Sequence, residues 1–175
     1  MKDRGSSPSK FVASCVRTLA GEEHRGAVDV PCGFGRHTLL VAEAGFFVTA
    51  IDIDPERIAH LSEAIVAAGV AYRVTPLAGD ALTFNFHSIE PFDLAIVTDF
   101  VSESLLRTVL KALNGSGHVI FETFSGRGGN WEDLPSAGSV ASCFEGTCEL
   151  LHYEEHTVGP DGADAVTVKC FAKKY

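Results

Sequence analysis

Hydrophobic residues recur along this chain with two periods, and their alternation predicts helices and strands in turn. Apolar side chains at helical spacing predict helices at 11–19, 36–44, 55–68 and 105–113. Ser9 and Asp54 stand where the first and third helices need a cap, and Gly21, Gly45 and Gly69 follow as stops. Runs rich in β-branched and aromatic residues predict strands at 27–32, 46–53, 72–77, 92–98, 118–124, 148–157 and 165–172.

The order of these elements predicts an α/β fold with an open sheet. Strands that alternate with helices run parallel, because each crossover uses a helix to return the chain, and the helices then cover both faces. The last two strands are joined only by the turn at 159–162, so they form an antiparallel hairpin. We expect residues 1–175 to form one domain, with residues 1–8 flexible.

Composition and charge narrow the function. The chain is 46% hydrophobic and 21% charged, as expected for one soluble domain, and its formal net charge of -9 argues against nucleic acid or membranes as partners. No apolar run approaches the roughly 20 residues of a membrane helix, and the head MKDRGSSPSK lacks a signal-peptide core. We therefore expect a cytoplasmic protein, and we interpret the five cysteines as reduced and mostly buried.

Candidate chemistry gathers where the first three predicted strands end. The turn AVDVPCGFGR carries Gly33 and Gly35, against which a ligand can lie closely, although two glycines alone also suit a simple tight turn. Asp52 ends the second strand and can accept hydrogen bonds from both hydroxyls of a ribose, with Ile53 beside it to cover an adenine. Asp80 ends the third strand and can accept from an exocyclic amine.

The turn favours S-adenosyl-L-methionine (SAM) over a dinucleotide. A dinucleotide loop has a third glycine where this chain has Thr38. SAM offers an ammonium group, a diol and an adenine amine but no phosphate, and the acidic residues Asp29, Asp52 and Asp80 suit those groups.

The same residues resemble the ordered motifs of class I SAM-dependent methyltransferases, over about residues 8–174. The motifs are Asp29 to His37, Val48 to Asp54, Gly79-Asp80-Ala81, Phe92-Asp93-Leu94 and Gly117 to Phe121. Within that superfamily, Cys-Gly-x-Gly-Arg-His, with Phe121 to Phe124 and Gly129-Asn130, is most similar to the small tellurite-resistance-type methyltransferases. Pro31 and the segment Thr98-Asp99-Phe100 depart from the usual pattern.

The resemblance implies a Rossmann-like sheet of seven strands and a set of cofactor contacts. Gly33 and Gly35 would line the methionine part of SAM, Asp29 would orient its ammonium, and Asp52 would bind the ribose. Ile53 would pack on adenine, while Asp80 and the Ala81 backbone would read its edge. The complete expected cofactor set is Asp29, Cys32, Gly33, Gly35, Arg36, Asp52, Ile53, Asp80, Ala81 and Thr98, with Cys32 interpreted as a packing residue.

The expected reaction is in-line transfer of the sulfonium methyl group to a small-molecule acceptor, with S-adenosyl-L-homocysteine (SAH) as the product. A general base is needed only if the acceptor loses a proton. Catalytic candidates are Arg36, Asp99 and Asn130; Arg36 and His37 can hold an anionic acceptor or simply be solvated, and Trp131 can be a lid or a core residue. The acceptor's identity, the oligomeric state and the pathway stay open.

The sequence leaves two alternative functions open. An NAD-dependent oxidoreductase would use Asp52 but leave Asp80 without a role, and a non-catalytic SAM-binding module or partner subunit would explain the absence of an obvious base. The segment His152 to His156 matches the H-x-x-E-H zinc pattern, but in a strand its histidines lie roughly 13 Å apart, so we expect no metal.

Overall fold

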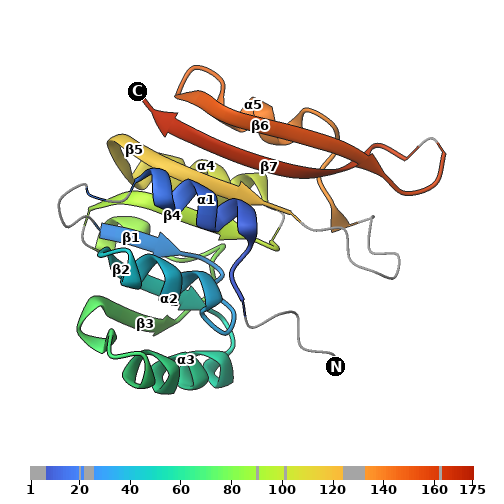
Figure 1. The fold of residues 1–175 in the computed structure, drawn as a ribbon. Helices are drawn as coiled ribbons and strands as arrows, with labels where there is room; N and C mark the ends of the chain where they lie inside the picture. The colour runs from blue at the N-terminus through green and yellow to red at the C-terminus, as the bar shows by residue number, and fades with distance from the viewer. Residues whose placement is uncertain are drawn as a thin grey trace.

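The computed structural model describes residues 7–19, 21, 26–89, 91–100, 102–123, 133–161 and 163–175. Within these ranges, seven strands form one sheet in the order β3-β2-β1-β4-β5-β7-β6 (Figure 1). Strands β1 to β5 run parallel, and β7 is antiparallel to both β5 and β6. The strands are β1 (Gly26–Asp29), β2 (Phe47–Asp52), β3 (Val74–Ala78), β4 (Phe92–Thr98), β5 (Leu113–Glu122), β6 (Cys148–Val158) and β7 (Ala165–Lys174). This confirms the predicted Rossmann-like sheet and its antiparallel hairpin.

Helices cover both faces of the sheet, as predicted. The helices are α1 (Lys10–Thr18), α2 (Arg36–Glu43), α3 (Pro55–Ala67), α4 (Glu103–Ala112) and α5 (Ser139–Phe144). Leu94 and Ile96 of β4 pack in the core with residues of α1, α2 and α3, whereas Ala95 and Val97 pack in the core with residues of α4 and α5. Because β4 is buried on both faces, its residues 94–97 form a continuous apolar run rather than an alternating one. No helix in the described part of the chain is long and apolar enough to cross a membrane.

The predicted helix caps are present. The Ser9 hydroxyl oxygen accepts the Phe11 N–H, and the Asp54 carboxylate accepts the Glu56 N–H. Each cap satisfies a backbone donor that the first turn leaves without a helical partner.

Some boundaries differ from the predictions for local reasons. The strand β1 ends at Asp29 and not at residue 32, because Pro31 has no N–H to continue the ladder. The strand β3 begins at Val74, because the Arg73 N–H donates to the Val70 carbonyl in the 3₁₀ turn Ala71–Arg73. The strand β5 already begins at Leu113, which pairs with Phe92 ahead of a register shift. The six-residue helix α5 was not predicted, because so short a segment shows little periodicity.

The register brings the predicted site residues to one edge. Asp29 lies between Ala50 of β2 and Ile96 of β4, and Asp52 pairs with Ala78. Thr98 pairs with Glu122 of β5. The parallel strands therefore present their carboxyl ends, and the loops that follow them, on the same side of the molecule.

Candidate functional site

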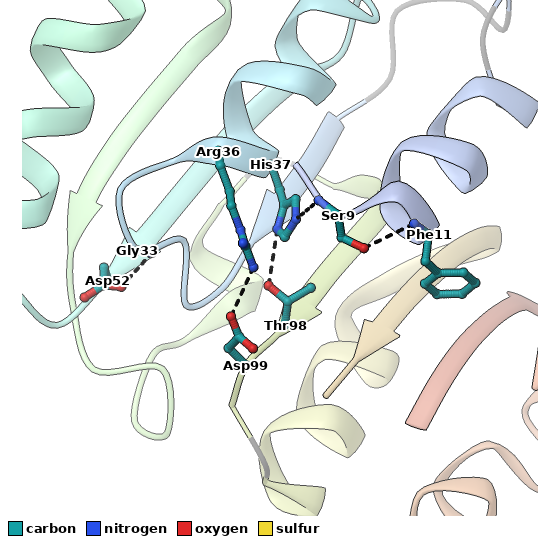
Figure 2. A network of polar contacts seen from close by, with 8 residues as sticks. All are labelled: Ser9, Phe11, Gly33, Arg36, His37, Asp52, Thr98 and Asp99. Atoms are coloured by element: carbon teal, nitrogen blue, oxygen red, sulfur yellow. Dashed lines mark hydrogen bonds and ion pairs between the residues drawn. The ribbon is translucent and has the colours of Figure 1, made fainter. Parts of the chain in front are cut away.

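The loop after β1 is tied to the end of β2. The Cys32 N–H donates to the Ile51 carbonyl at 2.8 Å, and the Gly33 N–H donates to Asp52 Oδ2 at 2.8 Å (Figure 2). Asp52 Oδ1 accepts the Asp54 N–H at 3.0 Å. The Asp52 carboxylate thus holds two loops together at the edge of the sheet.

Asp52 is buried at the position predicted for a ribose ligand. Arg57 Nη1 lies 3.6 Å from Asp52 Oδ2, and the Arg57 guanidinium also lies over the exposed Phe34 ring. Each carboxylate oxygen has two lone pairs. Both Asp52 oxygens therefore keep acceptor capacity beyond the backbone N–H groups that they bind.

Asp29 is a buried carboxyl group with one oxygen in use. Its Oδ2 accepts the Thr38 hydroxyl at 2.6 Å, while Oδ1 has no hydrogen-bond partner among the described residues. Burial raises the pKa of Asp29 to about 7, against the smaller opposing effects of Thr38 and Arg36. A buried carboxylate oxygen without a donor fits a cationic or hydrogen-bonding ligand group better than it fits an isolated core.

Apolar side chains are exposed beside these carboxylates. Phe34 is 61% exposed after β1, Ile53 is 67% exposed after β2, and Leu82 is 55% exposed after β3. Between Ile53 and Leu82, Asp80 caps its own turn by accepting the Leu82 N–H, and Ala81 is buried. Three exposed apolar side chains at neighbouring strand ends suit a flat apolar ligand group.

The two glycines of the turn have different structural roles. Both have positive φ, 57° at Gly33 and 82° at Gly35. A Cβ on Gly33 would meet nothing within 4 Å, so that side of the turn is open. A Cβ on Gly35 would overlap Leu61 Cδ1 of α3, so this glycine allows the turn to pack against α3.

The cysteine of the turn is a packing residue, as predicted. Cys32 is buried in the core under α1, α2 and α3, and burial raises the pKa of its thiol well above the usual range. It therefore stays a neutral thiol, which is a poor nucleophile.

His37 is neither solvated nor positioned to hold an anion, contrary to both readings of the sequence. It is 3% exposed, its Nε2 accepts the Ser9 N–H at 3.1 Å, and its Nδ1 lies 3.3 Å from the Thr98 hydroxyl (Figure 2). Burial, with help from Arg36, lowers its pKa to about 4. Since Nε2 accepts from a backbone donor, the neutral ring carries its hydrogen on Nδ1 and donates to Thr98.

Glu122 is a second buried carboxyl group at this edge. Its Oε2 has no hydrogen-bond partner among the described residues, and burial raises its pKa although the Ser9 hydroxyl hydrogen-bonds to it and Lys169 lies nearby. With His37 and Thr98, Glu122 forms a polar cluster around the start of α1.

Arg36 and Asp99, two of the three catalytic candidates, form an ion pair. Arg36 Nη2 lies 3.1 Å from Asp99 Oδ2, and the contact joins the first turn of α2 to the end of β4 (Figure 2). The third candidate, Asn130, and also Trp131 lie outside the described residues.

The histidines of the H-x-x-E-H segment converge on Glu154 in β6. His156 Nε2 lies 3.0 Å and His152 Nε2 3.9 Å from its oxygens, and Lys169 Nζ lies 3.5 Å away. The Lys169 ammonium group opposes a bound cation there. Within the described ranges, no three His, Cys, Asp or Glu side chains are grouped to hold a metal ion.

Sequence reasoning missed several residues of this edge. Thr38 was noted only as a missing glycine, Phe34 and Leu82 were overlooked, and the burial of His37 was not expected. Their position in the sequence could have indicated them, because each directly follows a residue already selected at a strand end or helix start. Their exposure and their partners depend on elements distant in sequence.

Comparison with known proteins identifies the family. The profile of the methyltransferase domain family matches residues 27–117, just over half of the chain. Among curated protein sequences, none matches significantly.

Solved structures share the fold at low sequence identity. One is a candidate rRNA methylase from Clostridium thermocellum, with 14% sequence identity and a TM-score of 0.70; the match covers 97% of this chain and 100% of that one. Another is TehB from Haemophilus influenzae, with 17% identity and a TM-score of 0.70; the match covers 93% of this chain and 62% of TehB. A third is the N-methyltransferase NodS from Bradyrhizobium japonicum WM9 in complex with SAH, with 17% identity and a TM-score of 0.68; the match covers 95% of this chain and 88% of NodS. The chain thus spans less than two thirds of TehB, which represents the subfamily that its motifs resemble.

The family match confirms the predicted class of enzyme, a methyltransferase, and excludes the alternative of an NAD-dependent oxidoreductase. The solved structures confirm the predicted fold. The chain belongs to the methyltransferase domain family.

Proposed function

We propose that this chain, acting as a single domain, transfers a methyl group from SAM to a small-molecule acceptor by in-line displacement, with SAH as the product. The observation that carries the proposal is the alternation of carboxylates with exposed apolar side chains at the ends of β1, β2 and β3. A ligand that joins an ammonium group, a diol and an adenine matches that alternation in charge and polarity.

The residues of the edge divide into groups that would hold different parts of the cofactor. Asp29 Oδ1, which is buried and has no partner in the described part of the chain, would accept the ammonium group, and Asp52 would accept the ribose hydroxyls. The open side of Gly33 leaves room for the cofactor against the backbone.

The adenine would be held at the ends of β2 and β3. Ile53 would cover one face, and Asp80 with the Ala81 backbone would bind the edge. Phe34 and Leu82, both exposed nearby, extend the apolar surface available to the ring. Arg36 and Thr98 would border the methionine part, with Cys32 and Gly35 shaping the turn.

The bound cofactor supplies a methyl group that is already activated on a sulfonium centre. The remaining work of the chain is to align the acceptor and to exclude water. Asp99 follows β4 directly and, among the catalytic candidates within the described residues, is the one that would contact the acceptor. It would take a proton only from an acceptor that has to lose one.

A small acceptor is favoured by charge. The net charge of -9 opposes binding to the phosphate backbone of RNA or DNA. The similar fold of a candidate rRNA methylase illustrates that one architecture serves several acceptors, so the acceptor class has to be argued from this chain's own residues.

Replacing the ribose ligand tests the cofactor site. Asp52→Ala should weaken SAM binding at least tenfold, about 1.4 kcal/mol, by isothermal titration calorimetry. Asp54→Ala is the matched control: it removes the cap of α3 and should lower the free energy of unfolding by about 1 kcal/mol while leaving SAM affinity nearly unchanged. Equal SAM affinity for folded Asp52→Ala and wild type would contradict the assignment.

The acceptor requires a second experiment. Transfer of a labelled methyl group from SAM should be measured against thiols, halides, oxyanions of selenium and tellurium, phenols and small amines, with bulk RNA as a macromolecular arm. Turnover on RNA alone would refute a small acceptor. Tight SAM binding without turnover on any acceptor would favour the non-catalytic SAM-binding module.

A further inference from the structure

The Arg36–Asp99 ion pair joins the two halves of the proposed site. Arg36 is the first residue of α2, directly after the Gly33–Gly35 turn, and Asp99 is the first residue after β4. Figure 2 shows the Arg36 side chain extending from the start of α2 to Asp99. Arg36 Nη2 lies 3.1 Å from Asp99 Oδ2. Both side chains are partly exposed, so a ligand can reach this contact.

The backbone of Asp99 is held independently of Arg36. Its φ of 59° lies in the left-handed region, where non-glycine residues are uncommon and often functional. The Asp99 N–H donates to the Glu122 carbonyl at 3.1 Å, which ties this conformation to the end of β5. The Asp99 side chain can therefore release Arg36 without any change in the path of the chain.

Arg36 is the cation best placed for the one carboxylate of the cofactor. Around the turn, Asp29 and Asp52 are acidic, and the Arg57 guanidinium is already paired with two carboxylates, 3.6 Å from Asp52 and 3.4 Å from Asp54. Arg36 also stands in the first turn of a helix, where the dipole adds to the attraction for an anion.

We propose that the cofactor carboxylate and Asp99 compete for Arg36, so that cofactor binding releases Asp99 toward the acceptor. This inference rests on the proposed function and adds a link between the two substrates. A released carboxylate at the end of β4 favours acceptors that donate a hydrogen bond or carry a protonated amine. By thermodynamic reciprocity, such an acceptor would in turn strengthen cofactor binding.

Titration with SAH tests the competition without an acceptor and without a sulfonium charge. Asp99→Asn should tighten SAH binding about two- to fivefold, the effect of removing a partly exposed ion pair. Asn tolerates the left-handed conformation, so the variant should fold, and thermal unfolding checks this. Arg36→Gln should weaken SAH binding, and adding Asp99→Asn to that variant should change nothing further.

Two controls separate competition for Arg36 from other effects. The affinity for 5′-methylthioadenosine, which lacks the amino-acid carboxylate, should be the same for wild type and Asp99→Asn. The proposed competition for Arg36 would be overturned if Asp99→Asn left SAH binding unchanged or weaker. It would also be overturned if Asp99→Asn tightened SAH binding equally in the Arg36→Gln background. Failure of the wild-type protein to bind SAM or SAH would instead overturn the proposed function.

Discussion

Asp29 is a buried carboxyl group for which folding favours the protonated form, whereas binding of an ammonium group would favour the ionised form. Its pKa of about 7 lies above the unfolded value of 3.8, so its contribution to stability is complete below pH 3.8 and is lost as the pH rises through 7. Thr38 and Arg36 offset only part of the cost of keeping this carboxyl group buried and ionised, and a bound cation would offset more of it. A residue retained at such a cost is a marker of function.

Asp29→Asn should therefore change stability and binding in opposite directions. Asn does not titrate, so the variant should gain about 3 kcal/mol over wild type between pH 5 and pH 8, measured by urea unfolding. Its SAM affinity at pH 8 should fall, because the ammonium group loses its counter-charge. A stability difference that does not vary with pH would contradict the high pKa, and unchanged affinity would contradict the ammonium contact.

Substitutions of Gly33 and Gly35 should have different effects, because only Gly35 packs against helix α3. Gly35→Ala should lower the free energy of unfolding by about 2–4 kcal/mol, because its Cβ overlaps Leu61 in addition to the left-handed cost. Gly33→Ala bears only the left-handed cost of about 1–2 kcal/mol but should weaken SAM binding.

A second substitution checks the steric cause. In a Leu61→Ala background, chemical denaturation should show a smaller penalty for Gly35→Ala, because the overlapping side chain is gone. An undiminished penalty would mean that the backbone conformation alone accounts for the loss.

His37 links α1 to α2 and β4 only while it is neutral. Its pKa falls from 6.5 unfolded to about 4 folded, so its contribution to stability is present at neutral pH and is lost as the pH drops through this range, by about 3 kcal/mol in total. Protonation would place a hydrogen on Nε2, which accepts the Ser9 N–H.

His37→Gln removes that titration while keeping an amide that can donate and accept. Urea unfolding at pH 7 and pH 4.5 should show the variant gaining about 2–3 kcal/mol relative to wild type at the lower pH. Asp29 and Glu122 titrate in both proteins, so their effects cancel in the difference. A constant difference would show that His37 keeps an ordinary pKa.

At the scale of the elements, local signals predicted most helices and strands. The bounds of β4 matched because its apolar run stops at the polar pair Thr98-Asp99. The caps Ser9 and Asp54 matched because each acts on an N–H two residues away. By contrast, Ser9 contacts His37 across 28 residues, and His37 contacts Thr98 across 61, so no local pattern carried these contacts.

At the scale of the whole molecule, the fold was predictable because few topologies join alternating strands and helices with short connections. The side-chain partners of the site were less predictable. Asp52 was expected as a ribose ligand, but its bond to the Gly33 N–H appears only when β1 and β2 lie side by side. The pairing of Arg36 with Asp99 likewise depends on the adjacency of β1 and β4.

The strand order also has a consequence for synthesis on the ribosome. The strand β7 lies between β5 and β6, although β6 precedes it in the chain. A nascent chain that has produced β6 alone has an open β5 edge, with backbone N–H and C=O groups that no neighbouring strand satisfies. Only when β7 emerges can the hairpin close that edge, so the β5-β7-β6 half of the sheet is the last to be completed.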